Sequence, residues 1–232
     1  MERHRTRWAI FGASVISADG NPDAHLLRAL GRVLVRDGHE VIFYEERGNP
    51  ALQRLLRQEG ARGLDAFRAA YPDITYRTIE RRFGADLVEW LTRTLATADV
   101  ALVQPGAPAT LATWVGRLTR RHLHTYLLDT GWGGLETPPD IAVLEPGNFS
   151  GVFAGPSVAD HAVPSDRLHR LDALPDAANL GADTAPDTLF PAAEHLATQV
   201  LAELEQGDAG VTSTTPPASQ GGEMEDHDPV TR

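Results

Sequence analysis

The sequence predicts an α/β fold in which helices cover both faces of one parallel, doubly wound sheet of Rossmann-like type. Short apolar segments rich in β-branched and aromatic residues alternate with amphipathic segments of helical length along most of the chain. The apolar segments are continuous, as expected for strands that are buried on both faces. Helical connections between them place successive strands parallel to one another.

The first strand–helix–strand unit is predicted from the N-terminal part of the chain. Residues 7–12 form a short apolar strand, and a polar loop leads to a helix over 23–37 whose leucines and valines recur at helical spacing. Gly38 follows at the position where a left-handed residue commonly ends a helix. The β-branched and aromatic run within 39–45 predicts a second strand, parallel to the first.

The same alternation continues through most of the remaining chain. Further helices are predicted over 50–58, 64–70, 85–96, 108–120 and 191–204. Further strands are predicted over 74–79, 99–104, 122–128 and 140–144. Residues 147–187 contain only short apolar runs, and we predict no strand or helix there. Six strands alternating with helices indicate one doubly wound sheet.

The C-terminal part differs in composition from the rest of the chain. Beyond Gly207 it consists mainly of Ser, Thr, Pro, Gly and acidic residues, without an apolar run that could offset the entropy of ordering. We therefore expect one Rossmann-like domain over 1–206, which includes a returning C-terminal helix, and a disordered acidic tail over 207–232. The tail carries five acidic residues and Arg232, hence −4 of the formal net charge of −11.

The composition excludes several classes of function. The 232 residues contain no Cys, which removes disulfides, thiolate metal sites and cysteine nucleophiles. All 21 basic residues are Arg, so a phosphate-loop lysine, a Schiff base and a lysine general base are excluded as well. The net charge of −11 opposes attraction to phosphate backbones and anionic membranes, and nucleic acid is not an expected partner.

The N-terminus shares one feature with secretory signals. Arg3, Arg5 and Arg7 precede an apolar run, but Gly12 and its small neighbours interrupt that run, which suits a first strand better. No stretch approaches the roughly 18 consecutive apolar residues of a membrane span. We expect a soluble, cytoplasmic protein.

A ligand of such a sheet binds outside the carboxyl ends of the strands, where the strand order reverses, usually between the first and fourth strands. Three loops rich in Gly and small or polar residues converge there, over 12–21, 104–108 and 129–136. The candidate substrate-binding residues are Gly12, Ser14, Ser17, Gly20, Asn21, Gln104, Gly106, Thr130 and Trp132. Gly lets a ligand approach the backbone, although Gly and Asn also occur simply as turn residues. The indole of Trp132 would stack on a sugar or base, or anchor its loop.

The common cofactor and metal motifs are missing from the sequence. It has neither G-x-G-x-x-G nor G-x-x-x-x-G-K-[ST], and H-E-x-x-H and G-x-S-x-G are also absent. Glu45 ends the second strand, where it would hold ribose hydroxyls in a nicotinamide enzyme or lie solvated at the strand end. His122 and His124 would share one strand face, as metal ligands do, but a solvated strand entry is the favoured interpretation. We expect no cofactor and no metal.

The segment 21–45 resembles the N-terminal half of GT-B glycosyltransferases, in which a helix followed by Gly-His-Glu-Val, here residues 38–41, is frequent. Within that group the likeness is closest to the spore-maturation type. There, an opening such as the Ile-Phe-Gly-Ala-Ser of 10–14 precedes a loop with Gly and Asn, and a strand ends in Asp-Thr, here 129–130. The likeness covers residues 7–160. It implies an acceptor-side domain, which faces a nucleotide-sugar-binding donor domain in complete members of the family.

The donor domain itself has no counterpart in the sequence. Its paired glutamates, eight positions apart, do not occur, and the chain after Ser150 is too short for such a domain. The resemblance implies that the acceptor lies near the first loop and that a side chain such as Asp19, His25 or Asp129 deprotonates its hydroxyl. From its position alone, Asp129 would orient a hydroxyl, act as a base, or cap the following turn.

Three hypotheses about function follow. The leading one is a glycosyltransferase-like protein with an acceptor-side domain only, which works with a separate donor-domain protein or is a degenerate, non-catalytic relative. The second is a non-catalytic module that binds a nucleotide or another small molecule in the same crevice. The third is an interaction protein that acts through its surface and acidic tail.

Overall fold

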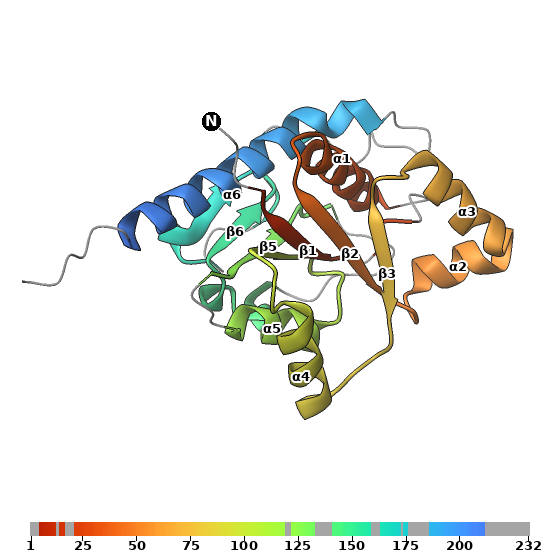
Figure 1. The fold of residues 1–232 in the computed structure, drawn as a ribbon, viewed down its shortest axis with the longest axis horizontal. Helices are drawn as coiled ribbons and strands as arrows, with labels where there is room; N and C mark the ends of the chain where they lie inside the picture. Colours follow the sequence, from red (N-terminus) through yellow and green to blue (C-terminus); the bar gives the residue numbers. More distant parts are fainter. Residues whose placement is uncertain are drawn as a thin grey trace, which may run out of the picture.

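The structure is a computed structural model that describes eight stretches of the chain, which together hold a seven-stranded sheet and its helices (Figure 1). The described residues are 5–12, 14–16, 21–118, 122–132, 141–158, 163–172, 174–175 and 186–211. The strands are β1 (Arg7–Phe11), β2 (Glu40–Glu46), β3 (Thr75–Ile79), β4 (Val100–Val103), β5 (His124–Asp129), β6 (Gly151–Ala154) and β7 (Leu168–Arg170). The helices are α1 (Pro22–Arg36), α2 (Pro50–Glu59), α3 (Ala61–Ala70), α4 (Gly84–Thr94), α5 (Ala109–Arg117) and α6 (Phe190–Val211).

The strands form one sheet in the order β3-β2-β1-β4-β5-β6-β7, and every neighbouring pair is parallel. The chain first builds outward from β1 to β3 and then crosses back to β4 on the other side of β1. The strand order therefore reverses between β1 and β4. This confirms the predicted doubly wound, Rossmann-like α/β fold.

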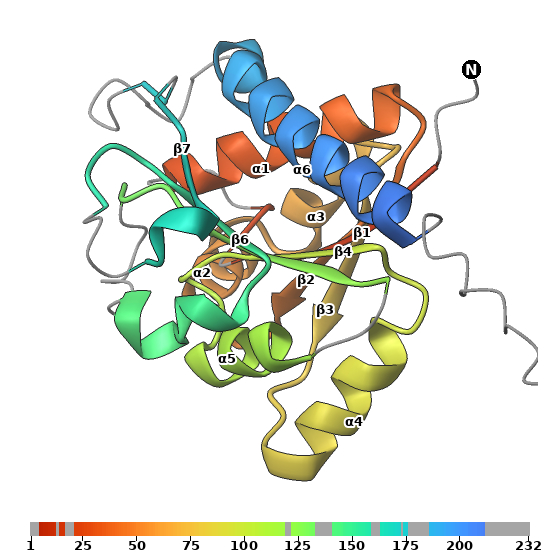
Figure 2. The same ribbon diagram turned by 90° about the vertical axis from the view of Figure 1, so that its left-hand side faces the viewer.

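The helices cover both faces of the sheet, as Figures 1 and 2 show. Helices α1 and α6 lie side by side on one face, and α4 and α5 lie on the other. Two apolar cores result, one under α1 and α6 and one under α4 and α5. Successive residues of β2 alternate between them, because Phe43 packs in the first core and Tyr44 in the second. We call these the α1 face and the α4 face.

The prediction of a strand over 140–144 is wrong. Ile141–Leu144 is a 3₁₀ helix in which Ile141 and Leu144 are buried while Val143 is 62% exposed. Apolar residues three apart share one side of a helical turn, whereas a strand would have buried Ile141 and Val143 together. The sixth strand is instead β6, a short run that is buried along its whole length, and β7 adds a seventh strand at the sheet edge. Both lie in the region where no strand or helix was predicted.

The last helix is longer than predicted. It was expected to end at Leu204, with a disordered tail from Gly207, but α6 continues to Val211. The first residues of the expected tail are therefore helical, and residues 212–232 lie outside the described part of the chain. Within the described ranges, no helix combines the length and the apolar character needed to cross a bilayer.

Candidate functional site

The three predicted loops begin at the same edge of the sheet, formed by the carboxyl ends of β1, β4 and β5. Gly12 follows β1 directly, and the N–H of Gln104 donates to the carbonyl of Phe11 at 2.9 Å, so these two loops start side by side. A Cβ atom on Gly12 would lie 3.1 Å from Gln104 Oε1 and 2.8 Å from Leu27 Cδ1. The missing side chain of Gly12 thus lets the amide of Gln104 lie against the β1 loop.

The side-chain amide of Gln104 is buried at this edge of the sheet. The residue is 2% exposed, and neither its Nε2 nor its Oε1 atom is paired with any described residue. Two further buried atoms beside the β1–α1 loop, Asn21 Oδ1 and His25 Nε2, are also unpaired within the described ranges. Buried polar groups are nearly always paired, because leaving one unpaired costs about 1–3 kcal/mol. These groups fit a site in which a polar ligand supplies the missing partners.

The start of the β1–α1 loop is held by hydrogen bonds from Arg28 of α1 and from Asn21, which directly precedes α1. Arg28 donates from Nε to the carbonyl of Val15 at 2.7 Å and from a terminal nitrogen to the carbonyl of Ile16. Its guanidinium carbon lies 5.6 Å and 5.3 Å from the centres of two aromatic rings of α3 and its end, those of Phe67 and Tyr71. Asn21 Nδ2 donates to the carbonyl of Ser14 at 3.4 Å. These contacts fix the loop backbone near the place where the strand order reverses, between β1 and β4.

Glu45 is buried beneath the same loop, on the α1 face. It is 2% exposed, and its Oε2 accepts the N–H of Val15 at 3.4 Å. Burial raises the pKa of Glu45 to about 7, although the Val15 N–H, nearby hydroxyls and the Arg28 guanidinium partly lower it. The expectation of a solvated strand end is therefore wrong. The carboxylate faces the protein interior, which also removes it from the ribose-binding role considered for it.

Two carboxyl groups flank Thr130 at the end of β5. The hydroxyl of Thr130 donates to Asp23 Oδ1 at 2.6 Å, and Asp129 Oδ1 accepts the N–H of Gly131 at 2.9 Å. Burial raises the pKa of Asp23 to about 6; the bond from Thr130 lowers it in part, and the charge of Asp129 raises it further. Burial also raises the pKa of Asp129. Asp23 was not among the candidates, although its place in the first turn of α1 marks a position favoured by acids.

Trp132 anchors its loop through its ring nitrogen. Nε1 donates to the carbonyl of Pro175 at 3.2 Å, and the backbone N–H of Trp132 donates to Thr130 Oγ1 at 3.3 Å. The preceding Gly131 has a φ of +69°, which Gly adopts without strain. These contacts favour the loop-anchor interpretation of Trp132 over a stacking platform.

The other candidates differ in where the structure places them. His25 is 4% exposed on α1; burial, and secondarily the charge of Arg28, lowers its pKa, which favours a neutral imidazole. Gly106 lies exposed in the turn that the Ala107 N–H closes onto the Gln104 carbonyl at 3.0 Å. Asp19, Ser17 and Gly20 lie outside the described residues.

The histidine pair does not form a metal site in the described structure. His122 lies in an exposed turn, and His124 begins β5 at the amino edge of the sheet, away from the three loops. In the described ranges, no three His, Asp or Glu side chains gather closely enough to hold a metal ion. Because β5 begins at His124, His122 precedes the strand on which it was predicted to lie.

Comparisons with known proteins add little to this description. No family model matches the sequence, and no curated protein matches it. Among solved structures, the chain is similar to a carbohydrate kinase from Agrobacterium tumefaciens, with a TM-score of 0.35 and 13% sequence identity. The alignment covers 64% of this chain and 60% of the kinase, so the chain spans less than two thirds of that protein. The parallel α/β fold follows from the sheet itself, and the resemblance to GT-B glycosyltransferases stays a prediction.

Proposed function

We propose that the chain binds a sugar or another hydroxylated small molecule at the carboxyl edge between β1 and β4, as a glycosyltransferase-like acceptor-side domain. The unpaired amide of Gln104 carries this proposal. It offers two donor hydrogens and one acceptor oxygen, and a sugar hydroxyl both donates and accepts. The unpaired atoms of Asn21 and His25 add an acceptor and a ring nitrogen beside the same loop. A polar ligand with several hydroxyls would offset the cost of burying these groups.

Substitution Gln104→Met should separate binding from folding. Methionine has a similar length and adapts to its surroundings, so the fold should persist while the amide is lost. We expect the wild type to bind at least one probe of a panel of monosaccharides and nucleotide-sugars saturably in saturation-transfer NMR. Gln104→Met should weaken that binding about tenfold or more, and raise the free energy of unfolding by about 1 kcal/mol because an unpaired buried amide is gone.

The matched control is Gln58→Met, which changes an exposed glutamine on α2. It should leave both the binding and the unfolding curve unchanged. The proposal is wrong if no probe binds the wild type saturably, or if Gln104→Met binds as well as the control.

For transfer, the described residue that best fits the general base is Asp129. Burial raises the pKa of Asp129, which makes its carboxylate a better proton acceptor than that of an exposed aspartate. The acceptor hydroxyl would lose its proton to the Asp129 carboxylate while its oxygen bonds to the anomeric carbon of a nucleotide-sugar. The nucleoside diphosphate then leaves with the electron pair of the broken bond. A separate donor-domain protein would supply the nucleotide-sugar.

A non-catalytic binding module is the second candidate function. The hydrogen bond between Asp129 and the Gly131 N–H favours it, because this carboxylate already has a structural role in its loop.

Substitution Asp129→Asn should decide between transfer and binding alone. The amide oxygen still accepts the Gly131 N–H, but it cannot take a proton. With a donor-domain protein and nucleotide-sugars present, we expect the release of nucleoside diphosphate to fall at least about a hundredfold, with sugar binding retained. Unchanged turnover would remove Asp129 from the mechanism, and no turnover in the wild type with any donor protein would favour the binding module.

A further inference from the structure

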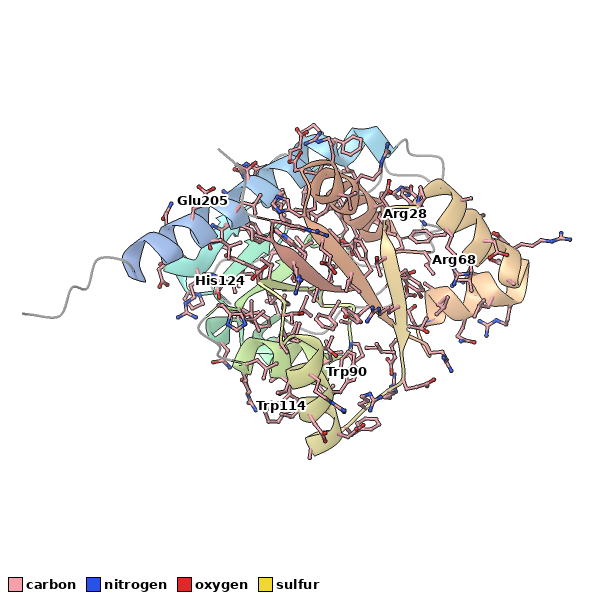
Figure 3. The ribbon with its side chains drawn as sticks, viewed as in Figure 1. Arg28, Arg68, Trp90, Trp114, His124 and Glu205 are labelled. Carbon is pink, nitrogen blue, oxygen red and sulfur yellow. The ribbon has the colours of Figure 1, made fainter. Side chains whose placement is uncertain are left out.

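A cavity of about 250 Å³ lies on the α4 face, at the carboxyl ends of β2 and β3. Figure 3 shows Trp90 on this side of the sheet and Arg28 on the other. The walls come from the end of β2, the connection from β3 to α4, one side of α4 and the start of α5. The cavity is separate from the groups around Gln104, which lie by the β1–α1 loop.

The apolar part of the cavity includes a fixed aromatic ring. Trp90 packs edge-on against Phe11 and Tyr44, with ring centres 6.3 Å and 5.9 Å apart, so neighbours on β1 and β2 hold the indole in place. Leu87 lines the same wall, and Phe83 at the rim is 66% exposed. Together these three side chains give the cavity a continuous apolar wall, as is common in ligand pockets.

The polar part of the cavity includes the buried carboxylate of Glu46 and two arginines, Arg81 and Arg82. Glu46 is 8% exposed, and both of its oxygens accept hydrogen bonds from Arg81. Arg82 donates from one terminal nitrogen to both oxygens of Asp86 at 2.9 Å, and its guanidinium carbon lies 5.9 Å from the centre of the Trp90 ring. Arg82 Nε is buried and has no hydrogen-bond partner among the described residues.

The charges around the cavity already balance. Arg81 neutralises Glu46, and Asp86 neutralises Arg82. Glu80, which also lines the cavity, is paired with Arg47, the residue that follows β2. An ionic ligand would bring an uncompensated charge next to the apolar wall, which is costly. The cavity therefore suits an uncharged ligand that supplies an acceptor to Arg82 Nε–H and a flat apolar surface to Trp90.

We propose that this cavity binds an uncharged, planar heteroaromatic ring of nucleobase size. The ring packs against Trp90, accepts a hydrogen bond from Arg82 Nε–H and donates one to the Glu46 carboxylate, whose oxygens have further acceptor capacity. A volume of about 250 Å³ holds roughly eight waters at about 30 Å³ each, which matches two fused rings. The proposal does not depend on sugar binding at Gln104.

Adenine is the probe that tests this proposal, measured by saturation-transfer NMR and by quenching of tryptophan fluorescence on the full chain. The wild type should bind adenine saturably, and 2-naphthoate, a flat anion of similar size, should bind at least about tenfold more weakly. Thr110→Trp places a large side chain at the exposed start of α5 beside the cavity and should abolish adenine binding. Arg82→Met should weaken binding about tenfold or more.

The control is Arg93→Met, which removes an exposed arginine at the far end of α4. It should bind adenine as the wild type does. The proposal is overturned if adenine does not bind saturably, if 2-naphthoate binds more tightly, or if Thr110→Trp or Arg82→Met binds adenine as the control does. Because adenine contains no sugar and the monosaccharide probes contain no base, either proposal can fail alone.

Discussion

Gly155→Ala is expected to lower the free energy of unfolding by about 3 kcal/mol or more, because the new methyl group would collide with backbone rather than with a movable side chain. Its Cβ would lie 2.0 Å from the carbonyl oxygen of Thr130 and 2.7 Å from the carbonyl carbon. The Gly155 N–H also donates to the carbonyl of Asp129 at 2.8 Å, so the ends of β5 and β6 are joined there. Relieving the collision requires the β5 loop to move.

Chemical denaturation of Gly155→Ala and Gly147→Ala measures this effect. A Cβ on Gly147 would meet only Pro164 Cγ, at 3.8 Å, so that variant should unfold within about 0.5 kcal/mol of the wild type. Equal unfolding free energies for the two variants would show that the β5 loop yields without cost. Because Asp129 and Thr130 lie at the collision, Gly155→Ala should also weaken any binding that depends on them.

Glu45→Gln is expected to stabilise the protein by about 3 kcal/mol above pH 7 and to leave it unchanged below pH 4.5. Burial holds the folded-state pKa at about 7, whereas the ordinary value is 4.5. Between these values the unfolded chain has released the proton that the folded chain still holds. Wild-type stability therefore falls as the pH rises through this window. Glutamine is neutral throughout, and its amide oxygen still accepts the N–H of Val15.

Unfolding curves measured across this pH range test the prediction. The control is Glu59→Gln, which changes an exposed glutamate at the end of α2 and should leave the pH dependence intact. Asp23, whose pKa burial raises to about 6, contributes a slope of the same sign, so Glu45→Gln should reduce the slope rather than abolish it. A variant whose stability follows the wild-type curve above pH 7 would show that the carboxylate is solvated.

The sheet could be predicted because its central strands carry a strong local signal. The runs that became β1, β2 and β4 are continuous, apolar and separated by amphipathic helices, which leaves few arrangements for a parallel sheet. The signal failed where the apolar runs are short. Residues 141–144 and β6 are both four residues long and mostly apolar, and only packing shows that the first is a helical turn and the second a strand.

The location of the candidate site was predictable, but its internal contacts were not. Strand order places Gln104 beside Gly12, and a reversal between the first and fourth strands is the usual arrangement in a doubly wound sheet. The pairing of Thr130 with Asp23 joins residues 107 positions apart, and no local pattern indicates it. The same holds for the cavity at Trp90, whose walls come from four separate segments.

By itself, the sequence determined the fold class, the reversal of strand order and the edge at which small and polar residues gather. The reason is that the spacing of apolar residues and the lengths of the connections between strands can be read from residues close together in the chain. The tertiary structure alone decided that Glu45 turns inward while Glu46 lines a cavity on the opposite face. It also decided that the side-chain amide of Gln104 has no hydrogen-bond partner among the described residues. Burial and hydrogen-bond pairing depend on atoms that come from distant segments of the chain. These atoms set the pKa values and decide which polar groups stay unpaired, and binding would depend on both.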